Sequence, residues 1–306
     1  MNYIFIVNPH ARTGLGGMTW DLIEPELKKR RIAYSTYITE KSGHAEKIAR
    51  EITADGKEHT IVVLGGDGTV NEVLNGMKDP EKITLGYIPI GSSNDFARGL
   101  GIRKEPLEAL EVVLAGKKTV ELDVGVISRN GKKRKFAVSA GIGFDAGVCH
   151  QVCISRWKIL LNKLNLGKLS YAVVALDRLI KCRPAAMSVQ VDGGKEETFQ
   201  KVYFAAFMNL PCEGGGFRFC PKALPSDGKL DLLVAADVSK LKVLLLLPVA
   251  LLGRHTGFRG VTLRRGSRIR VRSERPLPIH TDGEPLFLRR EAEAYTGEEK
   301  IRVITG

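Results

Sequence analysis

Thr60-Ile61-Val62-Val63-Leu64-Gly65-Gly66-Asp67-Gly68-Thr69 brings together a strand, a glycine loop and the start of a helix. The first five residues form a short, β-branched apolar run, which is typical of a buried parallel strand. After the loop, apolar residues from Val70 to Met77 recur at helical spacing. Thr69 is a good N-cap and Glu72, three residues later, completes a capping box, so we predict that the helix begins there.

The glycine loop has the properties of a phosphate cradle. Its glycines leave no side chain between the loop backbone and a ligand, and a helix N-terminus offers free N–H groups to an anion. Taken alone, the loop fits a tight strand-to-helix turn equally well. A carboxylate among phosphate-binding amides would repel the ligand unless a metal or a hydroxyl proton lay between them. Asp67 therefore indicates Mg²⁺-assisted phosphoryl chemistry.

Strands and helices alternate through the first third of the chain. We predict strands over residues 3–7, 33–38, 60–64 and 85–88, with helices between them and a short helix after residue 94. This order predicts a mostly parallel sheet with helices on its faces. Ligands bind outside the carboxyl ends of such strands. Asn8, Thr39, the Gly65 loop and the Gly91 loop all fall at that edge.

From about Leu122 the pattern changes to paired strands. Asn130-Gly131, between residues 124–129 and 132–140, and Asp192-Gly193-Gly194, between Val191 and Val202, have the composition of hairpin turns, which predicts two hairpins. Further strands are expected over 229–235, 267–272 and 276–281, helical insertions over 158–181 and 240–252, and a last strand over 301–304 with no assigned partner. The middle and end of the chain therefore look like an antiparallel β domain.

The formal net charge of +13 implies an anionic partner: nucleic acid, a nucleotide or an acidic membrane surface. Nucleic acid is disfavoured because no RNA-binding aromatic signature or Cys/His finger spacing accompanies the basic residues. Five cysteines form no CxxC pair and follow no signal peptide, which fits reduced thiols in a cytoplasm.

The longest apolar stretch, Val243 to Leu252, contains Pro248. It is much shorter than the roughly 20 residues that span a bilayer, so we do not expect a transmembrane protein. A buried helix and a helix in contact with a membrane interface both fit it.

Three further acidic motifs are ambiguous when each is read alone. Ser92-Ser93-Asn94-Asp95 lies between a strand and a helix, where it could hold phosphate oxygens and help to position Mg²⁺, or simply cap the helix. Thr281-Asp282-Gly283-Glu284 and Pro225-Ser226-Asp227-Gly228 both fit ordinary β-turns.

Together these motifs resemble the diacylglycerol kinase catalytic domain family of lipid kinases. The resemblance rests on Asn8-Pro9, residues 65–76 and 88–98, the stretch from Gly214 to Asp231, and Asp282-Gly283-Glu284. Their order and spacing cover nearly the whole chain and are most similar to the small bacterial soluble members. The resemblance implies transfer of the γ-phosphoryl group of ATP to a lipid hydroxyl, with diacylglycerol as the expected substrate and phosphatidic acid as the product.

The family pattern also implies the fold. It predicts a Rossmann-like α/β nucleotide domain with a parallel sheet, an antiparallel β-sandwich domain, and an active site in the cleft between them. We expect residues 1–122 to form the ATP-binding domain and 123–292 the lipid-substrate domain, with 293–306 as a candidate to return to the first. ATP and Mg²⁺ are the expected cofactors.

Site residues carry over from the resemblance one position at a time. The expected nucleotide contacts are Asn8, Pro9, Thr39, Gly66, Asp67, Gly68, Thr69, Val70, Asn71, Glu72 and Ser92. Asp67 would lie near Mg²⁺ and Asp95 would help to position it. Glu284 takes the place of the family's proton acceptor, which removes the proton of the lipid hydroxyl. Asp227, with the backbone of Lys229, matches a structural Mg²⁺ site.

The chain departs from the family pattern at three positions. Ser92 replaces the usual threonine but keeps the hydroxyl. Leu15 stands where a small relative carries a lysine, so a cation must come from Arg12 or elsewhere. Leu224 stands where relatives place a serine beside the structural metal.

Other functions stay open at this point. NAD kinases share the Gly-Gly-Asp-Gly-Thr loop, although residues 94–98 differ from their second motif; sphingosine-type lipids are further candidate substrates. A non-catalytic nucleotide- or lipid-binding protein is disfavoured because Asp67 and Glu284 are both present. We expect a cytoplasmic protein held peripherally at the inner face of an anionic membrane, at about 1 kcal/mol for each Lys or Arg near the surface. Whether it forms a homodimer is left open.

Overall fold

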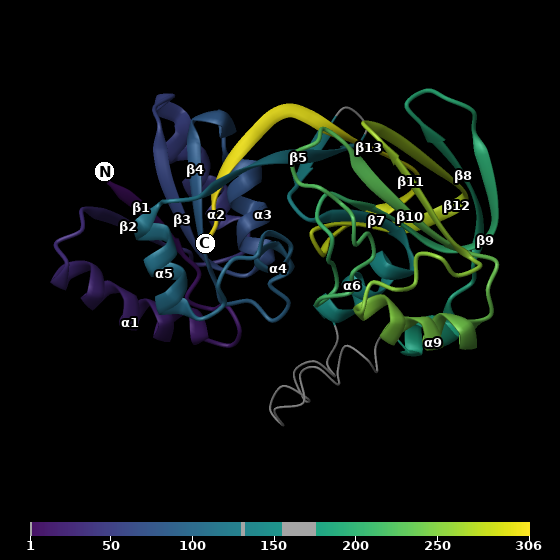
Figure 1. Cartoon of the computed structure of the whole chain (residues 1–306), viewed down its shortest axis with the longest axis horizontal. Helices are drawn as coiled ribbons and strands as arrows, with labels where there is room; N and C mark the ends of the chain where they lie inside the picture. Colours follow the sequence, from purple (N-terminus) through teal and green to yellow (C-terminus); the bar gives the residue numbers. More distant parts are fainter. Residues whose placement is uncertain (1, 130–131, 155–175) are drawn as a thin grey trace.

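A computed structural model describes residues 2–129, 132–154 and 176–306 of the 306-residue chain. The described strands are linked by hydrogen bonds into one set of thirteen, which Figure 1 shows divided between two lobes. The turn predicted at Asn130-Gly131 and most of the helix predicted over 158–181 lie outside the described residues.

The first lobe is built on four parallel strands in the order β2-β1-β3-β4. These are β1 (Tyr3–Val7), β2 (Tyr34–Ile38), β3 (His59–Gly65) and β4 (Ile83–Pro89). Five helices accompany them: α1 (Leu15–Lys29), α2 (His44–Ile52), α3 (Asp67–Gly76), α4 (Asp95–Leu100) and α5 (Pro106–Ala115). The strands predicted from the sequence are confirmed here.

Helices cover both faces of this sheet. Successive residues of β3 point to opposite faces, so Ile61 packs with α2 and α3 while Val62 packs with α1 and α5. Every residue of β3 after His59 is buried. Burial on both faces explains why its sequence is continuously apolar rather than alternating.

The second lobe is antiparallel. Its strands are β5 (Thr119–Arg129), β6 (Lys132–Phe136), β7 (Ser139–Gly143), β8 (Ala185–Val191), β9 (Glu197–Met208), β10 (Leu230–Ala236), β11 (Val261–Gly266), β12 (Arg268–Thr281) and β13 (Glu284–Ile304). The helices α6 (Phe144–Ile154) and α9 (Lys240–Leu251) lie along one side of the lobe (Figure 1). Both predicted hairpins are present, because β5 pairs with β6 and β8 with β9.

Two strand predictions are revised by the structure. Residues 267–272 and 276–281 belong to one strand, β12, whose pairing with β13 shifts register between Arg272 and Leu277. A bulge lets a strand bend and continue past a proline such as Pro276. The last strand, predicted over 301–304, is the end of β13. Its Arg302 and Val303 pair in parallel with β4, so the chain ends beside the first lobe.

The predicted capping box of α3 is wrong. The helix begins at Asp67, and its N-cap is Gly66, which makes no side-chain capping bond. Glu72 instead accepts hydrogen bonds from the backbone N–H groups of Gly43 (2.8 Å) and Ala45 (3.1 Å), at the start of α2. The reason is that the first turn of α2 needs acceptors for its N–H groups, and a carboxylate from the neighbouring helix supplies them.

Candidate active site

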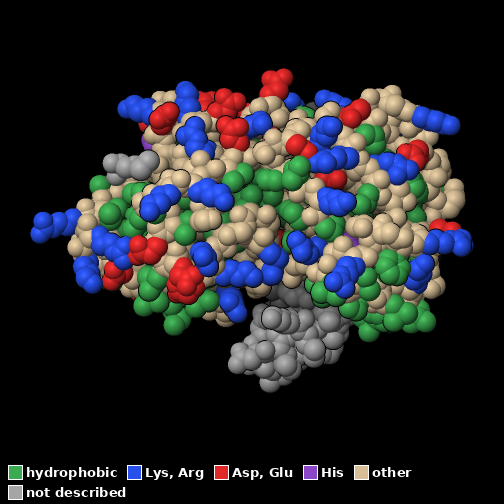
Figure 2. Space-filling model, viewed as in Figure 1, with side chains coloured by type: hydrophobic (Ala, Val, Ile, Leu, Met, Phe, Trp, Pro, Cys, Tyr) green, Lys and Arg blue, Asp and Glu red, His purple; other side chains and the backbone are tan. Residues whose placement is uncertain are grey.

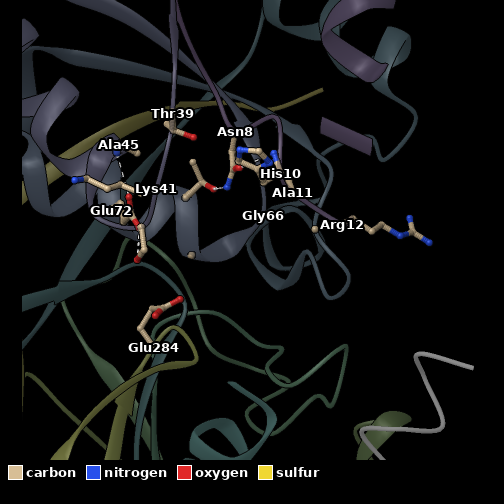
Figure 3. A pocket seen from close by; sticks show the side chains of 14 residues that line it. Asn8, His10, Ala11, Arg12, Thr39, Lys41, Ala45, Gly66, Glu72 and Glu284 are labelled. Atoms are coloured by element: carbon tan, nitrogen blue, oxygen red, sulfur yellow. Dashed lines mark hydrogen bonds between the residues drawn. The ribbon is translucent and has the colours of Figure 1, made fainter. Parts of the chain in front are cut away.

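A cavity of about 450 Å³ lies at the carboxyl ends of the parallel strands. It is lined by Asn8, His10, Ala11 and Arg12 after β1, by Thr39, Lys41, Ser42 and Ala45 after β2, by Gly66, Gly68, Thr69 and Glu72 around the start of α3, by Gly91 after β4, and by Glu284. Glu284 is the one lining residue in this set that comes from the second lobe, and Figure 3 shows it facing Asn8 and Thr39 across the cavity. The loops that the sequence placed at one edge therefore do meet there.

The glycines of the loop permit close approach. A Cβ atom on Gly68 would lie 2.8 Å from Oε1 of Glu284, and one on Gly66 would lie 3.2 Å from the Cα of Gly91. Neither glycine has a positive φ, so the need is for space and not for a special backbone conformation. The backbone of the loop is therefore open to the cavity, as a phosphate-binding loop requires.

Asn8 and Thr39 occupy the positions expected of them. Asn8 donates from Nδ2 to Oγ1 of Thr69 at 3.1 Å and accepts at Oδ1 from the N–H of His10. Thr39 is buried and lines the cavity. Sequence reasoning did not single out His10 or Lys41, whose signal is simply that they follow the ends of β1 and β2.

Five of the eleven expected nucleotide contacts do not line the cavity: Asp67, Pro9, Val70, Asn71 and Ser92. Pro9 and Ser92 each lie one position from a lining residue, and the side chain of Val70 belongs to the apolar core. Asn71 is fully buried and bonds to the second lobe. A ligand in the cavity would contact these residues only through their backbone atoms, or after a movement of the loops.

Asp67 lies behind the loop, outside the cavity lining. Its carboxylate accepts hydrogen bonds from the N–H groups of Asp95 (3.0 Å) and Phe96 (3.1 Å), and thereby caps α4. Burial, and then the negative charge of Asp95, raise the pKa of Asp67 to about 7. This capping contact joins the two acidic motifs that the sequence singled out separately.

Asp95 ties α4 to the second lobe. Its Oδ2 accepts a 2.8 Å hydrogen bond from the N–H of Gly215, and its Oδ1 lies 3.6 Å from Nε of Arg98. Burial is the largest cause of its raised pKa. Two buried carboxylates with raised pKa values, Asp67 and Asp95, are therefore the first residues of α3 and α4.

Asp282 and Gly283 form the two-residue turn between β12 and β13. Both have positive φ values, 48° and 82°, and Thr281 pairs with Glu284 across the turn. The carboxylate of Asp282 accepts from the N–H groups of Ala137 (2.8 Å), Val138 (2.8 Å) and Ser139 (3.0 Å). The turn is therefore anchored on both sides, and Glu284 emerges immediately after it.

A buried network that sequence reasoning missed supports the same turn. Nε2 of His280 lies 3.2 Å from Oδ2 of Asp145 and 3.1 Å from Oε1 of Glu213, and Nδ1 accepts from the N–H of Gly283 at 3.2 Å. Because Nδ1 is the acceptor, the proton of a neutral imidazole is on Nε2 and points to the carboxylates. A metal ion on Nε2 would move that proton to Nδ1, against the N–H of Gly283. The network is therefore a hydrogen-bonded support.

The predicted metal site at Asp227 and Lys229 does not fit a divalent cation. Asp227 accepts from the N–H of Lys229 at 3.1 Å and forms a salt bridge with Arg265. The neighbouring Asp123 accepts from Gly228 and lies 3.3 Å from Nζ of Lys300. Each carboxylate already faces a basic side chain, which would repel a second positive charge. The positive charge beside these two carboxylates comes from Arg265 and Lys300.

Comparison with known proteins identifies the architecture. Residues 2–127 match the diacylglycerol kinase catalytic domain, and residues 137–289 match the YegS C-terminal NAD kinase beta sandwich-like domain. The chain belongs to the diacylglycerol kinase catalytic domain family. It is accordingly a phosphotransferase with an alcohol acceptor, of the lipid kinase group.

Individual relatives cover most of the chain. YtlR of Bacillus subtilis (strain 168), a protein assigned to the lipid kinases, is 33% identical over 288 residues, covering 92% of this chain and 93% of that protein. The diacylglycerol kinase of Mycobacterium tuberculosis (strain ATCC 25618 / H37Rv) is 31% identical over 261 residues, which cover 84% of this chain and 80% of that kinase. A crystal structure of a diacylglycerol kinase from Bacillus anthracis str. Sterne shares the fold, with a TM-score of 0.70 at 21% identity and coverage of 100% and 97%.

Proposed function

We propose that this lipid kinase transfers the γ-phosphoryl group of ATP to the hydroxyl of diacylglycerol and so forms phosphatidic acid. The observation that carries the proposal is the position of Glu284. Its carboxylate comes from the second lobe and lies so close to Gly68 that a single added methyl group would meet it at 2.8 Å. A proton acceptor thus stands beside the loop that holds the phosphates.

ATP fits the cavity on its first-lobe side. The open backbone from Gly66 to Thr69, at the start of α3, would hold the phosphates, while Asn8 and Thr39 would contact the nucleotide from neighbouring loops. Arg12 and Lys41 stand at the rim with long, exposed side chains. They are the candidates for the cation that Leu15 does not provide.

Glu284 would act on the acceptor. As the hydroxyl oxygen of the lipid attacks the γ-phosphorus, its proton passes to the carboxylate of Glu284. The bond between the γ-phosphorus and the β,γ-bridging oxygen breaks, and ADP leaves with the electron pair. Because the transfer needs little covalent chemistry from the protein, positioning of the hydroxyl and stabilisation of charge supply most of the catalysis.

Mg²⁺ is the proposed metal partner of the nucleotide. It would offset negative charge on the transferring phosphates. Asp67 and Asp95 are the carboxylates that would hold it from behind the loop. Burial is the first cause of the raised pKa of each, and Arg98, which lies 3.6 Å from Asp95, lowers the pKa of Asp95 only in part. A readout other than turnover is available, because binding of Mg²⁺ with a non-hydrolysable ATP analogue would lower the pKa of Asp67.

The decisive experiment is transfer of radiolabelled phosphate from ATP to a panel of acceptors in mixed micelles. The panel contains diacylglycerol, a sphingoid base and, free in solution, NAD. We expect label in phosphatidic acid and a fall in kcat of about 10² to 10⁴-fold for Glu284→Gln, with a nearly unchanged KM for ATP.

Glu291→Gln is the matched control for Glu284→Gln. Glu291 lies on the same strand and pairs with Arg270 and Arg272, away from the cavity. If label appeared only in NAD, or only in the sphingoid base, that compound would be the substrate instead of diacylglycerol. Full turnover by Glu284→Gln would show that Glu284 is not the proton acceptor.

A further inference from the structure

Helix α9 exposes leucines that the fold of the second lobe does not use. Val243 and Ala250 are its buried residues, and Val243 packs beside Phe204 and Leu233 on the outside of the sheet. By contrast, Leu241 is 66% exposed and Leu245 is 63% exposed. The helix is therefore attached by a narrow contact and presents most of its apolar surface to solvent.

We group the exposed apolar residues on α9 and on the segments that bond to it as the α9 patch. It consists of Ile180, Leu241, Leu244, Leu245, Leu252 and Phe258. Nζ of Lys240 donates to the backbone oxygen of Ile180, which places that segment against the start of α9. Figure 2 shows hydrophobic side chains gathered along the lower edge of the second lobe, where Figure 1 places α9. Exposed apolar patches of this kind mark sites that meet a partner or a membrane.

The charge around the α9 patch selects its partner. No Asp or Glu occurs from Val238 to Ser273, whereas Lys240, Arg254 and Arg259 are exposed beside the leucines. Among these three cations Arg259 has a carboxylate nearby, that of Asp237 at 3.9 Å, while Asp177, near Ile180, is neutralised by Lys181 at 2.6 Å. A second copy of this chain would bring like charges together across a shared interface, which is unfavourable. An anionic lipid surface would satisfy both the leucines and the cations.

We propose that the α9 patch docks the protein on an anionic lipid bilayer. Its leucines enter the boundary between headgroups and acyl chains, while Lys240, Arg254 and Arg259 contact lipid phosphates. The helix lies on the surface, and no helix within the described ranges has the length and apolarity needed to cross a membrane. The proposal rests on the proposed function, because a lipid acceptor must be drawn from such a surface.

The test is sedimentation with sucrose-loaded vesicles, without ATP. We expect the parent chain to bind vesicles of phosphatidylcholine mixed with phosphatidylglycerol and to bind pure phosphatidylcholine weakly. Leu241→Ser with Leu245→Ser lowers the vesicle partition coefficient at least about tenfold, because two leucines no longer leave water. Arg254→Glu with Arg259→Glu removes the preference for phosphatidylglycerol.

The single variant Leu245→Ser is measured beside the double variant, and Leu22→Ser is its matched control, since Leu22 is 62% exposed and lies on α1 of the other lobe. The proposal is overturned if the parent does not sediment with either vesicle, or if Leu22→Ser loses as much binding as Leu245→Ser. All these substitutions are at exposed positions, and circular dichroism verifies that each variant is folded.

Turnover on short-chain dioctanoylglycerol in detergent, with no bilayer present, separates this proposal from the proposed function. The α9 variants should retain the parent's kcat there. Patch-dependent binding to vesicles without turnover on any lipid would defeat the proposed function and leave docking intact. Turnover in detergent without binding to vesicles would support the proposed function and overturn docking by the α9 patch.

Discussion

Asn71 and Asp282 connect the two lobes directly. Nδ2 of Asn71, on the helix that follows the glycine loop, donates a 2.8 Å hydrogen bond to Oδ2 of Asp282 in the turn before Glu284. Asn71 is fully buried, and the carboxylate of Asp282 also accepts from three backbone N–H groups of the second lobe. The contact therefore sets the position of the proposed base relative to the proposed phosphate site.

Asn71→Ala should lower both stability and activity. Loss of the bond leaves buried polar groups unpaired, at a cost of about 1 to 3 kcal/mol in the free energy of unfolding. Because the turn before Glu284 is then no longer bonded to the helix after the glycine loop, the Glu284 carboxylate is less precisely positioned. We therefore also expect kcat to fall by roughly tenfold or more, measured by phosphate transfer to diacylglycerol.

Asn75→Ala is the control for that prediction. Asn75 lies one turn along the same helix. It bonds to the backbone of Lys135 and donates to the two oxygens of Asn71, and none of these bonds reaches Asp282. It should lose comparable stability and keep a kcat near that of the parent. Equal losses of kcat in the two variants would mean that the bond to Asp282 has no special part in positioning Glu284.

Gly68→Ala should leave the fold intact and damage catalysis. The new Cβ meets the end of the Glu284 side chain at 2.8 Å, and a flexible side chain can move away at little cost in stability. Moving the carboxylate by about 1 Å is expected to reduce kcat by about 10²-fold. Gly17→Ala, also in a helix and with only ordinary contacts at 3.7 Å, should change neither the melting temperature nor kcat appreciably. Normal turnover in Gly68→Ala would contradict the close approach of the two lobes.

Asp67 should make the parent less stable as the pH rises from about 4 to 7. Its folded pKa of about 7 exceeds the ordinary value of 3.8, so the folded state holds a proton that the unfolded state has released. Between these values the free energy of unfolding falls with pH, by an amount on the order of 4 kcal/mol in total. Asp67→Asn cannot titrate, and one amide oxygen can still accept from the start of α4.

Denaturant unfolding of the parent and of Asp67→Asn at pH 4, 5.5 and 7 provides the measurement, since other carboxylates titrate in both proteins. The difference in the free energy of unfolding between the two should move in favour of the variant as the pH rises. A difference that is constant with pH would show that the pKa of Asp67 is close to its unfolded value.

His280 should act as a positioning residue for the turn that carries Glu284. In His280→Asn the side-chain oxygen can still accept from Gly283, whereas in His280→Gln the longer amide can reach Asp145 and Glu213 but leaves Gly283 without its acceptor. We expect His280→Gln to lose on the order of tenfold in kcat with little change in the KM for ATP, and His280→Asn to lose less. The same kcat in both folded variants would give His280 a purely structural role.

Local patterns in the sequence predicted most of the elements that build the site. The parallel strands of the first lobe, the two hairpins of the second and the place of Asn8, Thr39 and the glycine loop at one edge follow from apolar spacing and turn residues. Glu284 was also identified, through the family resemblance, and the structure brings it to the cavity. These features depend on neighbours a few residues apart or on the fixed geometry of a parallel sheet.

Partners distant in sequence could not be predicted in the same way. Thr69 and Glu72 have the spacing of a capping box, yet Glu72 caps α2, and Asp67 caps α4 rather than facing the cavity. The family resemblance predicted a metal at the carboxylate of Asp227, whereas in the structure this carboxylate forms a salt bridge with Arg265. In each case several groups could satisfy the same acceptor, and the one that does so is the one that packing brings nearest.

Periodicity and backbone freedom within a few residues set which segments become strands and helices and where the glycine loop lies. Packing of the whole chain settles that β13 returns to β4, for which residues 293–306 were a candidate, that Asn71 meets Asp282, and that His280 lies between Asp145 and Glu213. These pairings join residues more than 60 positions apart. They form only when packing of two apolar cores brings the lobes together, so that burial leaves each polar group with one available partner.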